Sequence, residues 1–251
     1  MPDASAKATR RQRELAQIAP RPEHHHRDID RGTARAAVFG VSDGLVSNVS
    51  LILGVAGANP GAGIVRLAGL AGLISGAVSM SAGEYISMKA QTELFERELE
   101  LERRELVRNP HVEMVELTQI YQSRGVDPDR ARELAEQMMR DPDMALQTHA
   151  REELGIDPDK LGSPTGAAIS SFIAFALGAL VPLLPWFFAS GTAATVSSVL
   201  LGFVASAVVG TLLARFTGRS VLFSAGRQVA IAVFAAGVTF LIGNAVGVGV
   251  A

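Results

Sequence analysis

A set of carboxylates between residues 102 and 153 offers the clearest chemistry in this sequence. Glu102 and Glu105 are three residues apart, and so are Glu113 and Glu116. On a helix, side chains three residues apart lie on the same face, about one turn from each other. Two helices that carry one pair each would bring four carboxylates onto facing surfaces, an arrangement that suits a divalent cation. The same residues could instead form solvated helix faces, because glutamate is a good helix former.

The segments on either side of these carboxylates are strongly apolar, which predicts a membrane protein. Hydrophobic residues make up 48% of the chain and the mean hydropathy is +0.26, which is high for a soluble protein. Charge is segregated, because residues 91–160 hold 18 of the 25 acidic residues and only 10 of the 23 basic ones. The absence of cysteine excludes disulfides and thiolate metal sites. A pI near 6.2 argues against a nucleic-acid-binding protein.

Five apolar runs are long enough to cross a bilayer, since 22 helical residues span roughly 33 Å. These predicted spans are residues 36–57, 64–88, 164–188, 192–216 and 227–250. The second span continues without a Gly or Pro break as a charged helix to Arg108. Three short amphipathic helices should follow, at about 111–123, 128–140 and 142–154.

The predicted fold is therefore an all-α membrane protein. It has five transmembrane helices, with a helical cytoplasmic metal-binding domain inserted between spans two and three. The predicted parts are a cytoplasmic N-terminal arm (1–32), spans one and two (33–90), the carboxylate-rich domain (91–162) and spans three to five (163–251).

Arginines set the predicted orientation. Residues 1–30 carry five arginines, and the connection 215–227 carries three arginines and no acid. The positive-inside rule places both in the cytoplasm, which makes the inserted domain cytoplasmic and puts the C-terminus outside. The chain lacks a eukaryotic sorting pattern, which favours a bacterial plasma membrane. Within the arm, His24-His25-His26 could bind a transition metal or could be an ordinary tail.

The first two spans carry side chains that could pass a cation. The first contains Asp43 and Asn48; the second contains Met80 and Glu84, which share a helix face that can turn toward Asp43. An acid inside a span is costly and is a functional candidate by default. A thioether tolerates softer transition metals, although a methionine in a span is also ordinary packing. We predict that Asp43, Met80 and Glu84 line a transport path.

The chain resembles the vacuolar iron transporter family. The resemblance covers about residues 30–250 and rests on Gly40-Val-Ser-Asp-Gly44, on Gly76-Ala-Val-Ser-Met80 and on five glutamates. Those glutamates are Glu102, Glu105, Glu113, Glu116 and Glu153. The resemblance implies that Asp43 and Met80 lie in the metal path and that the glutamates bind metal at its cytoplasmic mouth. It also implies a homodimer that exchanges cytosolic Fe²⁺, and related divalent ions, for protons.

The chain departs from that family at several positions. Plant members carry further acids where this chain has Ala36 and Gly72, and they carry glycine where it has Glu84. A methionine pair just before their last glutamate reads His149-Ala150 here. These differences imply that a proton step could move to Glu84 and that His149 could serve as a nitrogen ligand. Glu84 could also be a structural residue at the membrane interface.

The predicted function is proton-coupled export of Fe²⁺, with Mn²⁺, Co²⁺ and Zn²⁺ as candidate further substrates. We predict no prosthetic group and no enzymatic activity. The expected partners are divalent ions, protons, the lipid bilayer and a second copy of the chain, with no nucleic acid. The alternatives are a membrane-tethered carboxylate iron oxidase and a metal sensor without transport. Ferritin-like oxidases use Glu-x-x-His pairs, whereas the pairs here are Glu-x-x-Glu, and neither alternative explains Asp43 and Glu84.

Overall fold

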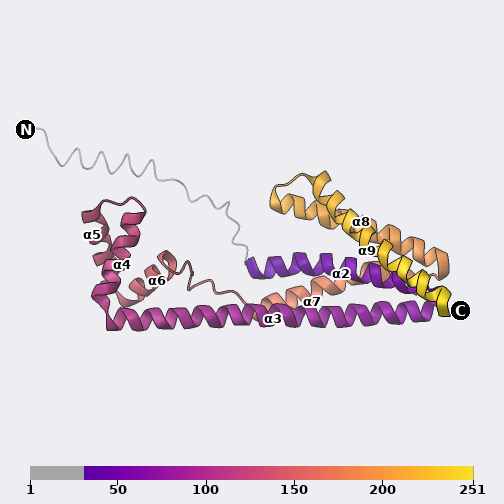
Figure 1. Ribbon diagram of the computed structural model, residues 1–251, viewed down its shortest axis with the longest axis horizontal. Coiled ribbons are helices and arrows are strands. Elements are labelled where there is room, and N and C mark those ends of the chain that lie inside the picture. Colours follow the sequence, from indigo (N-terminus) through magenta and orange to yellow (C-terminus); the bar gives the residue numbers. More distant parts are fainter. Residues whose placement is uncertain (1–30, 251) are drawn as a thin grey trace, which may run out of the picture. The chain divides into compact units, whose positions relative to one another are not determined.

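The structure is a computed structural model that describes residues 31–250 (Figure 1). These residues form helices, and the described part of the chain contains no β-strand. The triplet His24-His25-His26, for which the sequence leaves metal binding or an ordinary tail open, lies outside the described residues, as does nearly all of the predicted arm. The elements are α2 (Arg31–Gly57), α3 (Ala62–Arg108), α4 (Pro110–Ser123), α5 (Pro128–Met138), α6 (Pro142–Glu152), α7 (Pro164–Leu183), η1 (Leu184–Phe187), α8 (Gly191–Thr217) and α9 (Val221–Val250).

Five of the described helices are long and apolar enough to cross a membrane, judged by length and composition. They are α2, α3, the α7–η1 segment, α8 and α9, in the order that the hydropathy pattern predicts. The all-helical class and the five apolar helices are thus confirmed. The surface of this bundle carries many exposed leucine, isoleucine, valine and phenylalanine side chains, which fits a lipid environment.

Helix α3 is the longest element and carries both candidate sites. Its 47 residues run unbroken from Ala62 to Arg108, a rise of about 70 Å. In Figure 1, α2 and α7 lie along its first part, whereas α4 and α6 lie near its last part. It ends at Arg108, with Asn109 as its C-cap, because Pro110 lacks the backbone N–H that would continue the helix, and α4 begins at that proline.

Helix α2 is the centre of the apolar bundle, where it contacts α3, α7, α8 and α9. Its closest neighbour is α7, and the two backbones approach where glycine removes a side chain. A β-carbon at Gly44 would collide with the backbone of Phe175, and one at Gly178 would collide with the backbone of Val41. Small residues at such crossings allow close helix packing in lipid, where dispersion contacts replace the hydrophobic effect.

The short helices between α3 and α7 begin where the sequence predicts, each at a proline. The carboxylate of Asp127 accepts hydrogen bonds from the backbone N–H groups of Asp129 and Arg130 at the start of α5. Asp141 does the same at the start of α6, and the Ser163 hydroxyl caps α7. Proline at the first helical position and an oxygen acceptor just before it satisfy groups that have no intrahelical partner.

The third span ends at its prolines, as the sequence predicts, whereas the fifth helix starts earlier than the sequence predicts. Pro182 and Pro185 end α7 at Leu183 and convert the next four residues to a 3-10 turn. The predicted fifth span starts at residue 227, whereas α9 starts at Val221, so the loop after α8 is only residues 218–220. Gly218 ends α8 in the left-handed conformation, with φ of 66°. The apolar residues Val221, Leu222 and Phe223 form the start of α9, so Arg227 lies within a helix.

Candidate metal centre

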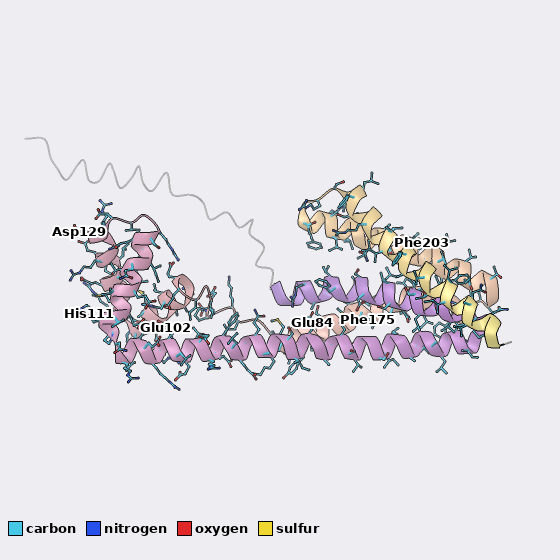
Figure 2. The ribbon with its side chains drawn as sticks, viewed as in Figure 1. Glu84, Glu102, His111, Asp129, Phe175 and Phe203 are labelled. Carbon is cyan, nitrogen blue, oxygen red and sulfur yellow. The ribbon has the colours of Figure 1, made fainter. Side chains whose placement is uncertain are left out.

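Four side chains from three parts of the chain meet beside the last turns of α3. Glu102 comes from α3, Glu113 from α4, His149 from α6 and Glu153 from the residue that ends α6. One possible ligand atom from each lies within 4.8 Å of all the others. Figure 2 shows Glu102 on α3 at the place where the short helices gather. We call these four residues the Glu/His cluster.

His149 is at the middle of the Glu/His cluster. Its Nδ1 lies 3.1 Å from Oε1 of Glu102, 3.5 Å from Oε2 of Glu153 and 3.9 Å from Oε2 of Glu113. His149 is fully buried, and Glu102 and Glu113 are 3% and 5% exposed. Both ring nitrogens of His149 and Oε1 of Glu102 are buried without a hydrogen bond of good geometry to a described residue. Buried polar atoms in that state are costly unless something binds them.

The proximity of the acids changes the pKa values within the cluster. Burial, with the negative charges of Glu102 and Glu116, raises the pKa of Glu113 and of Glu153 above the ordinary glutamate value. For His149, burial by itself lowers the pKa, but the adjacent Glu102 carboxylate, helped by Glu153 and Glu113, outweighs it and raises the pKa. The cluster therefore holds protons more tightly than isolated side chains would. A divalent cation would relieve the same repulsion.

The donor set suits a borderline divalent metal. Three carboxylates supply oxygen, and a neutral imidazole supplies nitrogen, a combination that binds iron, manganese, cobalt and zinc better than it binds calcium or magnesium. The residues present thus fit a divalent transition metal as substrate.

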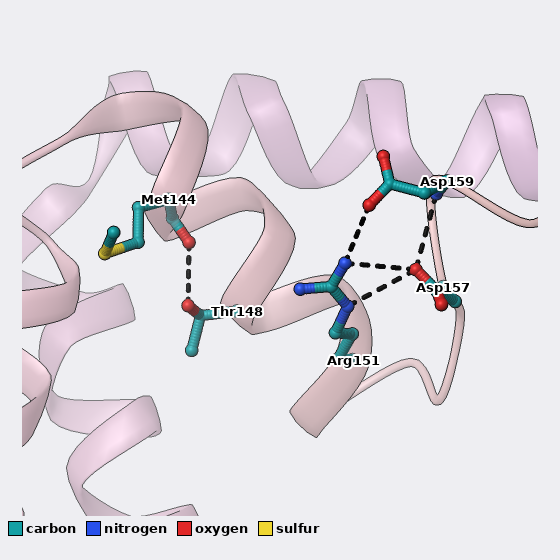
Figure 3. Close-up of polar contacts among 5 residues, drawn as sticks. All are labelled: Met144, Thr148, Arg151, Asp157 and Asp159. Carbon is teal, nitrogen blue, oxygen red and sulfur yellow. Dashed lines mark hydrogen bonds and ion pairs between the residues drawn. The ribbon is translucent and has the colours of Figure 1, made fainter. Parts of the chain in front are cut away.

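Ion pairs hold the end of α6 in place next to the cluster. Arg151 contacts Asp157 at 3.1 Å and Asp159 at 2.9 Å, which ties α6 to the loop that follows it (Figure 3). Arg124, after α4, pairs with Glu152. Each pair is exposed and contributes little stability by itself. Together they fix the residues on both sides of Glu153.

Glu105 and Glu116, which the spacing also nominates, lie outside the four-residue group. Glu105 is exposed and Glu116 is partly buried. Residues three apart on a helix differ by about 60° in direction, so one of each pair faces the cluster while the other faces partly away. Both still act at short range, since their charges contribute to the raised pKa of Glu113.

A second polar site lies between α2, α3 and α7, in the apolar bundle. It is an open pocket of about 300 Å³. It is lined by Asp43, Ser47, Gly72, Ser75, Gly76, Ser79, Met80 and Phe175. The Ser47 hydroxyl donates a hydrogen bond of 2.9 Å to Oδ1 of Asp43. The structure thus brings Asp43 and Met80 to one pocket, which we call the Asp43 pocket.

Glu84 does not line the Asp43 pocket. Its carboxylate lies 3.4 Å from the Arg35 guanidinium near the start of α2, and its side chain is 15% exposed. Figure 2 shows Glu84 and Phe175 in the bundle part of the molecule. The helical-face argument linked Glu84 to Met80 and missed Arg35, although Arg35 is the last cationic residue before the first apolar run. No sequence signal points to Phe175, whose ring packs against Gly76.

Comparison with known proteins identifies the family. The model of the VIT family matches residues 34–244. A vacuolar iron transporter of Acanthamoeba castellanii is 41% identical over 202 residues, which cover 78% of this chain and 72% of that protein. Vacuolar iron transporter 1 of rice (Oryza sativa subsp. japonica) is 31% identical over 237 residues, which cover 92% and 94%. Vacuolar iron transporter 1 of Arabidopsis thaliana is 31% identical over 213 residues, which cover 84% and 85%.

These relatives bear on the predicted class of protein. They are named as transporters, and the VIT family consists of transporters and not of enzymes. The prediction of a non-enzymatic integral membrane protein agrees with this family and with the five apolar helices. With a family match across nearly all described residues, the chain belongs to the VIT family.

Proposed function

We propose that this protein carries Fe²⁺, and other divalent transition metals such as Mn²⁺, out of the cytosol across a membrane in exchange for protons. The observation that carries the proposal is the Glu/His cluster, a four-donor site with three buried ligands, whose Glu102 lies on the same helix that lines the Asp43 pocket. The names of the relatives support iron as a substrate. The resemblance at Asp43 and Met80 supports the use of this pocket as the path.

The two sites divide the work by their ligands. Three carboxylates and an imidazole hold a divalent ion firmly, which suits collection from a dilute cytosolic pool. The Asp43 pocket offers one carboxylate, one thioether and hydroxyls. Such a set binds more weakly, and an ion in transit must also leave. Met80 favours softer transition metals over Mg²⁺, which is far more abundant in cells.

Protons enter the proposal through competition for the same atoms. A carboxylate inside a span can hold a proton in one stage of the cycle and a metal ion in another. Asp43 faces the pocket, whereas Glu84 is occupied by Arg35. Glu84 would take part only when that ion pair opens. Transport coupled to a proton gradient therefore requires Asp43, and Glu84 modulates the coupling when it is released from Arg35.

We further propose that the Glu/His cluster, and the end of the helix bundle from which α3 and α7 connect to it, face the cytoplasm of a bacterial cell. The Arg35–Glu84 pair lies at the end of the bundle where α3 continues toward the cluster. Arg215 lies in the last turn of α8 and Arg219 lies in the short connection between α8 and α9, which parity places on the same side. The positive-inside rule assigns that side to the cytoplasm and leaves the C-terminus outside.

A homodimer is also part of the proposal. Asp43 is exposed in a single chain, and its pocket is open. A carboxylate that faces hydrocarbon is costly. A second copy that packs against the α2–α3 face would cover it.

Metal uptake into sealed vesicles tests the proposal. Purified protein in liposomes should accumulate Fe²⁺ under anaerobic conditions, and Mn²⁺ in a parallel experiment. Uptake should be faster when the vesicle interior is more acidic than the outside, because protons that leave the vesicle then drive metal in. Protein-free liposomes and an Asp43→Ala variant are the controls. Oxygen-dependent iron oxidation without metal flux would instead support an oxidase, and metal binding without either would support a sensor.

A further inference from the structure

Asn48 is a buried polar residue of α2 that has no role in the path proposed above. Its side chain is 2% exposed, and its Nδ2 donates a hydrogen bond of 2.6 Å to the backbone oxygen of Ala179 on α7. That hydrogen bond identifies the nitrogen end of the amide, so the opposite end is the carbonyl oxygen Oδ1. This Oδ1 is buried and has no hydrogen-bond partner among the described residues.

The free oxygen of Asn48 lies next to Gly72, one of the residues that line the Asp43 pocket. It lies on the side of Gly72, because a β-carbon placed on Gly72 would be 3.0 Å from it. Gly72 itself lines the pocket, together with Asp43. The missing side chain at Gly72 is what lets Asn48 and Leu51 of α2 approach α3 here.

The contact region between α2, α3 and α7, which we call the seam, contains both Asp43 and Asn48. Asn48 follows Asp43 by five residues on α2, which is a rise of about 7.5 Å. The residues beside Asn48 are displaced in the same direction along the bundle: Ala179 lies beyond Phe175 on α7, and Gly72 lies beyond Met80 on α3. This direction leads away from the Arg35–Glu84 end of the bundle.

Past Asn48 the seam becomes apolar. Ile52 follows it by one turn and packs with Val65 and Leu183 in a cluster of buried hydrophobic residues. An ion that leaves Asp43 in this direction therefore meets Asn48 one helical turn before that cluster.

Helix packing explains the NH₂ group of the Asn48 amide but not its carbonyl oxygen. The Nδ2 hydrogen bond joins α2 to α7, as polar groups often do between membrane helices. It leaves the carbonyl oxygen desolvated and unbound, which is unfavourable in a low-dielectric interior. Amide carbonyls are good ligands for hard and borderline divalent cations.

We propose that Oδ1 of Asn48 is an oxygen donor to the partly hydrated divalent cation at a second position in the path, beyond Asp43 and toward the far side of the membrane. The inference rests on the proposed transport function. A neutral oxygen holds a cation less firmly than a carboxylate does, so this position suits release from Asp43 and onward movement. A hard oxygen at this step also favours Mn²⁺ and Fe²⁺ over softer ions.

The test compares initial rates of Mn²⁺ uptake into liposomes for the full chain and its variants. Asn48→Leu has a similar volume but no oxygen, and we expect its maximal rate to fall about tenfold, the effect of one lost donor to a charged group. The half-saturating Mn²⁺ concentration should change little, because the Glu/His cluster is intact. Ser206→Ala is the matched control, since it removes another buried oxygen without a hydrogen-bond partner, on α8; it should transport like the wild type.

Asn48→Asp separates the oxygen from the hydrogen bond to Ala179. Aspartate keeps an oxygen on the Gly72 side but loses the Nδ2 donor, so we expect it to transport faster than Asn48→Leu. It should stay below the wild type, because an ionised carboxylate holds the cation more firmly than the amide oxygen does and is costly inside a span. Equal loss in both variants would show that Asn48 only joins helices, and a wild-type rate in Asn48→Leu would likewise overturn the inference. A wild-type protein that carries no divalent metal would overturn the proposed function as well, a distinct result.

Gly72→Ala provides an independent variant that leaves Asn48 in place. Its methyl group would stand 3.0 Å from Oδ1, which shields the oxygen from the pocket, and it would displace the Cδ2 end of the Leu51 side chain, which is 37% exposed and can rotate away. Alanine also favours the helix over glycine, so the variant should fold. We expect a slower maximal rate, and an unchanged one would count against the role of this oxygen even if Asn48→Leu proved unstable.

Discussion

The Glu/His cluster and the Asp43 pocket lie on one helix, yet they are built differently. Glu102 and Met80 are both on α3, about 33 Å apart along its axis. The cluster gathers four ionisable groups from distant parts of the chain in a largely buried space. The pocket has a single carboxylate, set among serines and glycines in the apolar bundle, and it is open.

The difference follows from the surroundings of each site. Beside the short helices, water is near, so several charges can be placed together and the repulsion is met by protons or metal. Within the apolar bundle each extra charge would cost several kcal/mol, roughly 3 at the least, so a path there must use few acids and neutral oxygens. The proposed collecting site and the proposed path thus differ in charge as their environments require.

The largest effect should come from the pocket. Asp43→Ala removes its only carboxylate, and we expect metal flux in liposomes to fall to the level of protein-free vesicles. Metal binding to the Glu/His cluster should remain, because that cluster is distant. Asp143→Ala, an exposed acid at the start of α6, is the control and should transport normally. Normal flux in Asp43→Ala would show that the pocket is not the path.

Removing ligands from the cluster should weaken binding more than it weakens maximal transport. Glu102→Gln combined with Glu113→Gln takes away two buried carboxylates, and we expect metal affinity to fall by about a hundredfold or more. Transport should be lost at low metal concentration and largely recover at high concentration. Calorimetry on the full chain measures the affinity, with exposed Glu96→Gln combined with Glu133→Gln as the control pair. Unchanged affinity would exclude the cluster as the collecting site.

The pH dependence of binding distinguishes the imidazole from the carboxylates. Ligands must lose their protons before metal binds, and the pKa of His149 is raised above its ordinary value of 6.5. Affinity should therefore start to fall while the pH is still above 6.5 and continue to fall into the mildly acidic range, well before ordinary carboxylates are protonated. His149→Gln should bind more weakly at high pH, but its remaining pH dependence should move to more acidic values, set by Glu113 and Glu153. Calorimetry across this range would contradict the assignment if both proteins lost affinity at the same pH.

The smallest effect should come from the Arg35–Glu84 pair. Arg35 is more than half exposed, so breaking the pair should change stability by at most about 1 kcal/mol. Glu84→Gln should keep metal transport, while its rate should depend less on the pH gradient. Arg35→Gln removes the partner and leaves the carboxylate free, which makes it the informative comparison. Proton coupling identical to wild type in both variants would assign Glu84 a structural role and leave Asp43 as the proton carrier.

The sequence by itself determined the elements of this protein. Apolar runs of sufficient length specify five helices, because in lipid each backbone polar group must be satisfied within the helix. Proline after Asp127, Asp141 and Ser163 specifies where short helices begin, since the cap and the proline act locally. The continuity of α3 beyond the second span follows from the lack of any Gly or Pro between Glu84 and Asn109.

The tertiary structure alone decided which side chains meet. Spacing predicts that Glu102 and Glu105 share a face, but only the packing of α4 and α6 selects Glu102 for the cluster and excludes Glu105. His149 reaches Glu102 across 47 residues of sequence, and Arg35 reaches Glu84 across 49. The physical reason is range: caps, breaks and hydropathy act within a few residues, whereas a site depends on the rotation of each helix against its neighbours, which the whole packed bundle sets.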